Sequence, residues 1–226
     1  MGTLLEFAPP APLLRRELER RLRVDIGADA ADAAIRAEIR FYRAHLHEGR
    51  DAAAVARLRR RCAEAMRPAL PAAVAEAPGE VLTGALLAAL RFAAYPDAAP
   101  ALRELRAAGC RLVVVSNWDA SLHERLAETG LAGLLDGALA SAEVGVAKPG
   151  PAIFARALAL AGVGAQDAWH VGDSPEADVA GARAAGIAPV LLVRGERAPP
   201  IADGVPVIAS LGELPRLAQY PPGGRR

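Results

Sequence analysis

The residues best suited to chemistry lie in WHVGDSPEAD, positions 169–178. Asp173 directly follows an apolar run, and Asp178 falls in the first turn or so of the next segment. Two carboxylates that converge at a strand end suit Mg²⁺, which prefers oxygen ligands. The alternative is that both acids only favour a helix amino terminus, where the helix dipole attracts negative charge. That alternative accounts for Asp178 but leaves Gly172–Asp173 at a strand end unexplained.

A second candidate is Lys148, in the segment VAKPGPAIF. It is the only lysine of the chain, whereas the other 26 of the 27 basic residues are arginines. A lysine kept against that background indicates a need for a compact point charge on a flexible stem. The alternative is a surface lysine that stands there by chance.

A third candidate is Ser116, with Asn117 beside it, in the segment VVVSNWD. A hydroxyl group and backbone amides at the end of a buried strand can hold an anionic oxygen, and a following helix adds a favourable dipole. The alternative is that Ser116 only caps a helix, as serine commonly does.

These three segments lie in a region where strands and helices alternate. Apolar strand-like runs cover residues 111–116, 137–141, 168–172, 188–193 and 205–210. Helical patterns cover residues 100–110, 119–130, 150–162, 174–186 and 211–217, with Asp119 or Ser121 and Ser174 as expected N-caps. This alternation predicts an α/β fold, a Rossmann-like doubly wound parallel sheet. Ligands of such sheets bind beyond the carboxyl ends of the strands.

The preceding region, residues 11–92, has helical periodicity and no convincing strand, and its last helix is expected over 84–94. It predicts an inserted all-helical cap domain. The expected division is therefore a remnant of a first strand and turn at 1–10, the cap at 11–92, the α/β core at 93–220 and a flexible tail at 221–226.

Composition excludes several classes of protein. The net charge of +1 gives no basic excess for binding nucleic acid. No apolar stretch approaches the roughly 20 residues that cross a bilayer. No signal peptide is visible, so a cytoplasmic location is expected. Cys62 and Cys110 lack metal-ligand spacing and are expected to be buried apolar residues. The oligomeric state stays open.

Taken together and in this order, Ser116 after a strand, Lys148 in a KP pair before a helix, and GDSPEAD after the next strand resemble motifs two, three and four of the haloacid dehalogenase-like hydrolases. DVAGARAAGI and YPDAAPALRELRAAG are also similar to that family. The resemblance covers almost the whole chain, and residues 11–92 match the family's inserted helical cap.

The resemblance implies a two-step hydrolysis in which an Asp attacks the substrate and forms a covalent aspartyl intermediate. Ser116, with Asn117 as a possible helper, would bind the transferring phosphoryl group. Lys148 would neutralise charge on the nucleophile and the phosphoryl oxygens. Asp173 would bind Mg²⁺ directly and Asp178 would support that site. The substrate would be a small phosphorylated molecule. The cap would supply specificity, with candidates Tyr42, Arg43, His45, His47 and Arg50.

The opening residues MGTLLEF depart from the family pattern. The first motif is D-x-D-G-T, and Gly2-Thr3 match its last two residues, which makes Thr3 a member of the site. Met1 then stands at the second Asp, and the nucleophile would lie two residues before Met1. Asp97 and Asp119 are expected only at turn or cap positions.

Three functional hypotheses follow. The first is a Mg²⁺-dependent phosphatase whose start is assigned too late, so that an apolar strand ending in Asp-x precedes Met1. The second is a metal-independent 2-haloacid dehalogenase, in which the same Asp attacks carbon; GDSPEAD, which keeps acids suited to Mg²⁺, counts against it. The third is a non-catalytic binding protein with a degenerate site.

Overall fold

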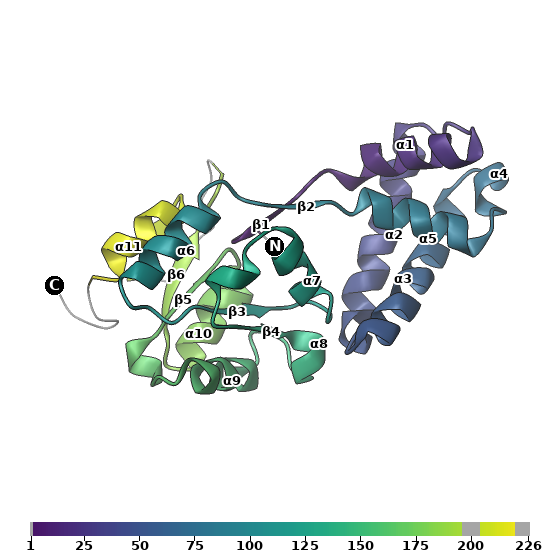
Figure 1. Cartoon of the computed structure of the whole chain (residues 1–226). Helices are drawn as coiled ribbons and strands as arrows, with labels where there is room; N and C mark the ends of the chain where they lie inside the picture. The colour runs from purple at the N-terminus through teal and green to yellow at the C-terminus, as the bar shows by residue number, and fades with distance from the viewer. Residues whose placement is uncertain (1, 196–203, 220–226) are drawn as a thin grey trace. The chain divides into compact units, whose positions relative to one another are not determined.

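The computed structural model describes residues 2–195 and 204–219, and the chain divides into two units (Figure 1). The helical unit consists of Phe7–Ala93 and Asp119–Ser121. The α/β unit holds Ala94–Trp118, together with the described residues before Phe7 and after Ser121. The expected tail at 221–226 and the carboxyl end of the expected core, residue 220, lie outside the described residues.

The helical unit contains five α-helices among the residues described. Apolar residues recur at helical spacing along each longer helix, and Asp51 caps α3 by accepting a hydrogen bond from the Ala54 amide. The helices are α1 (Pro10–Leu22), α2 (Ala28–His45), α3 (Ala52–Met66), α4 (Ala72–Ala75) and α5 (Gly79–Ala89), with 3₁₀ turns at Leu46–Glu48 and Arg67–Ala69.

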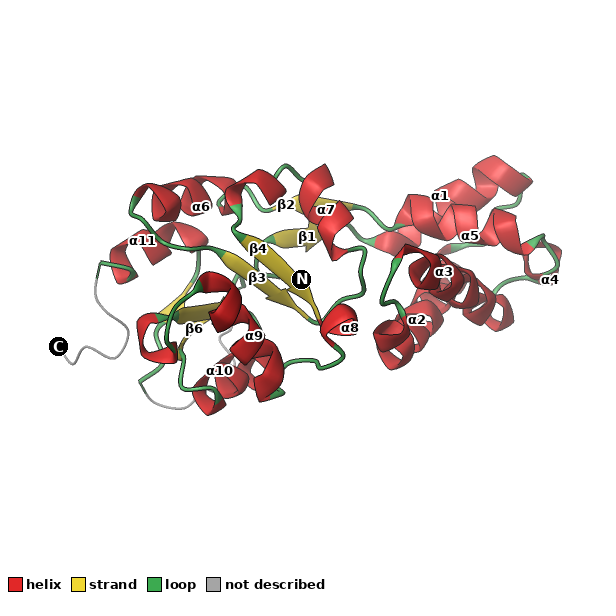
Figure 2. Ribbon diagram, turned by 60° about the horizontal axis from the view of Figure 1, so that its bottom comes forward, coloured by secondary structure: helices red, strands yellow, loops and turns green. Residues whose placement is uncertain are grey.

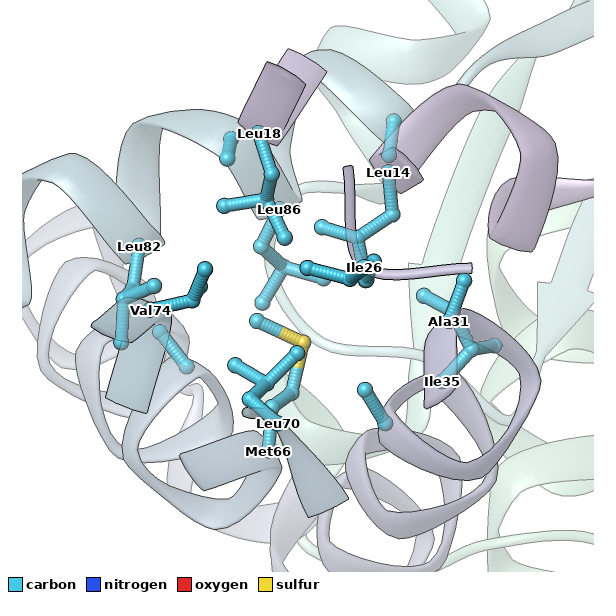
Figure 3. Packing of buried hydrophobic residues seen from close by; sticks show 14 of the residues in the cluster. Leu14, Leu18, Ile26, Ala31, Ile35, Met66, Leu70, Val74, Leu82 and Leu86 are labelled. Carbon is cyan, nitrogen blue, oxygen red and sulfur yellow. The ribbon is translucent and has the colours of Figure 1, made fainter. Parts of the chain in front are cut away.

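One apolar core holds the helical unit together (Figure 3). The cluster includes Leu14 and Leu18 of α1, Leu82 and Leu86 of α5, and Met66 of α3. All five side chains are fully buried. The same cluster includes Ile35 of α2 and Val74 of α4. Since this core draws on all five helices, the unit has an apolar interior of its own.

We expect Leu86→Ala to lower the free energy of unfolding by about 3 kcal/mol, because it removes a buried side chain and leaves a cavity. Its neighbour Leu87 is 49% exposed, so Leu87→Ala is a matched control that should change stability by less than about 0.5 kcal/mol. Urea denaturation followed by far-ultraviolet circular dichroism measures both. Equal losses in the two variants would show that this core is wrong.

The end of the helical region differs from the sequence prediction. The helix expected over 84–94 ends at Ala89, and Phe92–Ala94 form the strand β2. This strand pairs with β1 (Leu5–Phe7), and the Phe92 ring stacks on the Phe7 ring at 5.0 Å between centroids. Pairing with a segment more than 80 residues away along the sequence overrides the local helical pattern.

The α/β unit alternates strands and helices as the sequence predicts, and the predicted α/β fold class is confirmed. Its helices α6, α9 and α10 are labelled around the strands in Figure 2. The strands are β3 (Val113–Ser116), β4 (Gly137–Ala140), β5 (Trp169–Gly172), β6 (Ala188–Leu192) and β7 (Val207–Ile208). The helices are α6 (Ala98–Ala107), α7 (Leu122–Glu128), α8 (Ser141–Val144), α9 (Pro151–Ala161), the π-helix at Pro175–Ala180, α10 (Gly181–Ala184) and α11 (Leu214–Leu217), with 3₁₀ turns at Ala132–Leu134, Ala165–Asp167 and Leu211–Glu213.

The parallel strands of this unit form two separate sheets. β3 pairs with β4 in parallel, with Val113 opposite Gly137 and Ser116 opposite Ala140. The second sheet has the order β5-β6-β7, also parallel. Figure 2 shows β3 and β4 side by side. Among the described strands, none joins β3 to β5.

Two further sequence predictions concern burial. Cys62 is completely buried, and burial raises the pKa of its thiol to about 12, whereas Cys110 is half-buried. Neither takes part in a disulfide. No helix in the described part of the chain combines the length and apolarity needed to cross a membrane.

Candidate active site

Lys148 lies in the α/β unit just before α9, and its side chain is only 11% exposed. Its ammonium group donates to the Val115 carbonyl of β3 at 2.8 Å and to Oδ1 of Asp178 at 2.6 Å. A cation therefore stands at the carboxyl end of β3, fixed by a buried carboxylate. A mostly buried ammonium group with two fixed acceptors is what we expect of a lysine that is needed for its charge.

Asp178 is 4% exposed, and both of its carboxylate oxygens accept hydrogen bonds from the protein. Oδ1 also accepts from Nε2 of His170 at 2.9 Å, and Oδ2 accepts from the Ser174 amide at 3.0 Å. Burial alone would raise the pKa of Asp178, but the bond from His170 and the charge of Lys148 outweigh it and hold that pKa well below its usual range. Asp178 is therefore ionised, and its contacts tie it to Lys148 and His170.

The close approach of Asp178 explains why a glycine, Gly172, precedes Asp173. A Cβ atom on Gly172 would lie 2.1 Å from Cγ of Asp178, so any side chain there would displace the buried carboxylate. Ser174 caps the following π-helix by accepting from the Ala177 amide at 3.0 Å, as the sequence predicts. The absence of a side chain at Gly172 therefore leaves room for the Asp178 carboxylate against the end of β5.

Asp173 follows Gly172 and is exposed, unlike Asp178. Its Oδ1 accepts from the Thr3 hydroxyl at 2.8 Å. Gly2 has φ of +90°, and a Cβ there would lie 2.4 Å from Oδ2 of Asp173. Only glycine fits between this backbone and the carboxylate, so Gly2-Thr3 and Asp173 form one compact arrangement.

Ser116 and Asn117 lie at the carboxyl end of β3. The Asn117 side chain is bonded in both directions to Lys148: its Nδ2 donates to the Lys148 carbonyl at 2.8 Å, and its Oδ1 accepts from the Lys148 amide at 2.7 Å. Asn117 therefore fixes the backbone that carries the lysine. Among the described residues, the Ser116 hydroxyl has no hydrogen-bond partner, which leaves it available to a ligand.

One cavity of about 650 Å³ in the α/β unit is lined by all six residues that the sequence singled out. They are Thr3, Ser116, Asn117, Lys148, Asp173 and Asp178. The structure brings Thr3 to Asp173, and Lys148 to Asn117 and Asp178. The cation of Lys148 and the free hydroxyl group of Ser116, at the carboxyl end of β3, can bind an anionic group such as a phosphoryl. The exposed carboxylate of Asp173, at the carboxyl end of β5, can join such a group only through a bound cation.

The carboxylates of this region meet the needs of Mg²⁺ at one position, Asp173. The described residues contain no group of three or more His, Cys, Asp or Glu side chains arranged to hold a metal. Mg²⁺ is commonly held by one or two carboxylates with waters and substrate phosphate, and the exposed carboxylate of Asp173 suits that role. Asp178, whose oxygens are already bonded, fits only as a support behind Lys148.

Asp97 and Arg194 were not foreseen as part of this region. Arg194 donates to the Gly2 carbonyl at 3.0 Å and to the Thr3 carbonyl at 2.8 Å, and its guanidinium pairs with both oxygens of Asp97. Asp97 also accepts from the Ser210 hydroxyl and the Leu211 amide, although the sequence suggested only a turn or cap position. Burial would raise the pKa of Asp97, but these donors lower it overall. Only the fold brings together partners nearly 100 residues apart in sequence.

Asp119 also differs from the sequence prediction. It does accept from the Ser121 amide at 2.9 Å, but it is completely buried and pairs with Arg59 of α3 at 2.8 Å. The helix α7 begins only at Leu122. The Arg59 guanidinium lies over the Tyr42 ring, 4.7 Å from its centroid. Nothing in the residues around Asp119 indicates a partner so distant in sequence.

The other specificity candidates of the helical unit make local contacts. The His45 ring stacks on Phe41 at 4.0 Å between centroids, and its Nδ1 lies 2.8 Å from the Phe41 carbonyl. Arg50 reaches the His47 carbonyl only at 3.5 Å. Arg43 is one of the basic residues in the last turn of α2, which ends at His45.

We expect the stability of the α/β unit to depend on pH through His170. Burial lowers the pKa of His170 below 6.5, and the bond to Asp178 only partly opposes this. Below pH 6.5 the unfolded chain therefore binds a proton that the folded chain does not, and stability falls by up to about 1.4 kcal/mol per pH unit until the folded pKa is reached. We expect His170→Gln to show a shallower loss than the parent when thermal unfolding is compared between pH 7.5 and 5. Parallel curves would contradict this role.

Comparisons with known proteins show the family to which the chain belongs. A family model described as haloacid dehalogenase-like hydrolase matches residues 1–186. The chain belongs to the haloacid dehalogenase-like hydrolase family. The resemblance inferred from the motifs is thereby confirmed.

Among curated relatives, this hydrolase-family chain is 42% identical over 108 residues to a phosphoserine phosphatase of Thermus thermophilus, covering 47% of this chain and 43% of that protein. It is 37% identical over 103 residues to a glyceraldehyde 3-phosphate phosphatase of Methanopyrus kandleri, covering 45% and 44%. The matches thus span less than half of these relatives.

Among solved structures, a phosphatase of the same family from Thermococcus onnurineus has a TM-score of 0.63 and 26% identity, covering 98% of this chain and 96% of that one. A 2-haloacid dehalogenase from Pseudomonas syringae has a TM-score of 0.63 and 29% identity, covering 97% and 95%. Both activities named for the family therefore occur among its structural neighbours.

Proposed function

We propose that this member of the haloacid dehalogenase-like hydrolases is a phosphatase that removes a phosphoryl group from a small phosphorylated metabolite in the cytoplasm. The observation that carries the proposal is the arrangement of Lys148, Ser116 and Asp173 at the carboxyl ends of β3 and β5. The two curated relatives described above, both named as phosphatases, support the same choice. The domain Phe7–Ala93 would act as a cap that selects the substrate.

The attacking group in this proposal is an Asp carboxylate on the amino-terminal side of Gly2, two residues before Met1. Its oxygen attacks phosphorus, the bond from phosphorus to the leaving oxygen breaks, and an aspartyl phosphate forms. Water then attacks phosphorus, releases inorganic phosphate and restores the carboxylate. Both steps develop charge on the phosphoryl oxygens, so preorganised donors in the site lower both barriers.

Each residue of the site has a role in this proposal. Lys148, held by Asp178, offsets negative charge on the phosphoryl oxygens and the nucleophile. The Ser116 hydroxyl donates a hydrogen bond to a phosphoryl oxygen. Asn117 positions Lys148 through its two backbone bonds. The Thr3 hydroxyl, bonded to Asp173, orients that carboxylate.

Mg²⁺ would be held by Asp173 with waters and substrate oxygens, and when bound it supplies positive charge that screens the approach of the carboxylate to an anionic phosphoryl group. The exposure of Asp173, and the fact that one of its two oxygens accepts no hydrogen bond from the described residues, support this assignment. Asp178 contributes indirectly by fixing Lys148.

The second candidate function is 2-haloacid dehalogenation, favoured by the Pseudomonas syringae neighbour. In that reaction the same Asp attacks a carbon atom and halide leaves. No metal ion is required in that reaction, because the substrate brings a single carboxylate rather than a phosphoryl dianion. The two functions therefore differ in their dependence on a metal.

The test uses the full chain extended at its amino terminus by an apolar strand that ends in Asp and one further residue before Met1. Release of phosphate from p-nitrophenyl phosphate and of chloride from 2-chloropropionate are measured with Mg²⁺ and with EDTA. We expect phosphate release that EDTA abolishes, and no chloride. Chloride release that EDTA does not change would establish the dehalogenase instead, and no turnover of either would indicate a non-catalytic binding protein.

A further inference from the structure

The first described residues of the chain are held in place through their backbone carbonyls. The Gly2 carbonyl accepts a hydrogen bond from Nε of Arg194 at 3.0 Å. The Thr3 carbonyl accepts from a terminal nitrogen of the same guanidinium at 2.8 Å, and the Leu4 carbonyl accepts from the Tyr95 amide at 3.0 Å. Three consecutive carbonyls are therefore fixed by two residues, Arg194 and Tyr95, that lie far away in the sequence.

The Arg194 side chain is itself held by a carboxylate and an aromatic ring. Its guanidinium pairs with both carboxylate oxygens of Asp97 at 2.9 and 3.0 Å, and its Cζ lies 3.7 Å from the centroid of the Tyr95 ring. Arginine has five N–H donors in a planar fork, and Arg194 makes two hydrogen bonds to Asp97 and one each to Gly2 and Thr3. A lysine cannot reproduce this pattern, because its ammonium group is a single point of charge.

Asp97 is fixed in turn by two further donors. It stands at the N-cap position of α6, yet its side chain makes no capping hydrogen bond there. Its Oδ2 accepts instead from the Ser210 hydroxyl at 2.8 Å and from the Leu211 amide at 2.9 Å. Since Ser210 follows β7 and Arg194 follows β6, the pair joins three parts of the α/β unit to its first residues.

This arrangement reaches the candidate site through one hydroxyl group. The Thr3 hydroxyl donates to Oδ1 of Asp173 at 2.8 Å, and no other hydrogen bond to this exposed carboxylate comes from the described residues. An exposed Asp side chain turns readily about its terminal torsion unless a partner fixes it. The orientation of Asp173 therefore depends on where Thr3 is held, and Arg194 holds it.

We propose that Arg194 is a positioning residue, which orients Asp173 for a divalent cation through the Thr3 hydroxyl. The inference rests on the proposed function, in which Asp173 binds Mg²⁺. Arg194 acts in this role without contacting the metal or the substrate. Partners that orient a metal ligand from behind commonly contribute about 10- to 100-fold to metal affinity.

The experiment measures binding of Mn²⁺ to the 226-residue chain, without turnover. Mn²⁺ shares the preference of Mg²⁺ for carboxylate and water oxygens, and the electron paramagnetic resonance signal of free Mn²⁺ gives the Kd. Asp173→Asn should abolish the specific binding. Arg194→Met should raise the Kd at least about 10-fold, because the hydroxyl that orients the carboxylate is no longer held.

A double-mutant cycle separates positioning from general destabilisation. Thr3→Val removes the hydroxyl group and should raise the Kd about as much as Arg194→Met, whereas Thr3→Ser keeps the hydroxyl group and should stay within about twofold of the parent. In the Thr3→Val chain, Arg194→Met should add less than about a further twofold, because the group through which Arg194 acts is gone. Fully additive effects of the two substitutions would overturn the proposal.

Two control variants address stability. Ile153 is fully buried in a different cluster, with Phe154 and Ala182. Ile153→Ala should therefore lower the Tm and leave the Kd for Mn²⁺ unchanged. Arg103→Met, at an exposed position of α6, should change neither. A Kd that rises in the Ile153→Ala chain as much as in the Arg194→Met chain would reduce the effect of Arg194 to stability and overturn the proposal.

Should Arg194→Met fail to fold, Arg194→Lys takes its place, because it keeps the charge but cannot bond both carbonyls and Asp97 together. It should raise the Kd at least about 5-fold. An unchanged Kd in the folded Arg194 variant, with binding that Asp173→Asn removes, would overturn this inference and leave the proposed function standing. Binding that Asp173→Asn does not change, or no binding by the parent, would overturn the metal assignment of the proposed function and this inference with it.

Discussion

In the extended chain, replacing the added Asp two residues before Met1 with Asn should reduce phosphatase activity by at least about 10⁴-fold. The amide of Asn has nearly the shape of the carboxylate but is a poor nucleophile, so chemistry is lost while packing is retained. Phosphate release from p-nitrophenyl phosphate with Mg²⁺ measures the effect.

The control for the comparison of the Asp and Asn chains is their thermal stability. Both chains carry the same added apolar residues and differ only by Asp and Asn, so their Tm values should agree within a few degrees. Loss of activity at unchanged Tm assigns the carboxylate to chemistry. Retention of more than about a tenth of the activity in the Asn chain would mean that another group attacks, because removal of a nucleophile normally leaves far less.

Lys148→Ala should produce the second-largest effect, a loss of about 10³-fold in kcat/KM, equivalent to about 4 kcal/mol of transition-state stabilisation. The lysine places its charge at the carboxyl end of β3, fixed by the Val115 carbonyl and by Asp178. In a mostly buried site that charge acts more strongly than it would in water.

Because Lys148→Ala also leaves Asp178 without its cation, stability must be measured together with activity. Removing one partner of a buried pair is destabilising by about 3 kcal/mol or more, so assays are run well below the Tm of the variant. Added methylamine supplies an ammonium group of similar chemistry and should restore part of the lost rate, which a purely structural role would not allow. Arg103→Ala, at an exposed position, should leave kcat/KM unchanged. A Lys148→Ala chain with normal kcat/KM would exclude the lysine from the reaction.

The sequence was most informative where chemistry and local structure coincide. The alternation of strands and helices after residue 93 predicted the α/β fold, and the serine at position 174 predicted a helix N-cap. Both predictions succeeded because these features depend on residues that are close together in the sequence. The order of Ser116, Lys148 and GDSPEAD predicted the family. The structure then brings Lys148 to Asp178 and Thr3 to Asp173, at 2.6 and 2.8 Å.

The remainder depended on contacts distant in sequence. The strand Phe92–Ala94 looked helical because the alanines before it continue a helical pattern, and only pairing with β1 changes its state. Asp97 and Asp119 have the local signals of turn and cap residues. Their pairing with Arg194 and Arg59 follows from the packing of elements, which no local pattern encodes.

The most direct measurement of the central claim is the mass of the protein during turnover. The extended Asp chain is mixed with a phosphorylated substrate and Mg²⁺, quenched in acid and analysed by mass spectrometry of intact protein and peptides. We predict a mass increase of one phosphoryl group, located on the added Asp beside Gly2-Thr3 and absent from the Asn chain. Turnover without any phosphorylated Asp, or a phosphoryl group on another residue, would contradict the account.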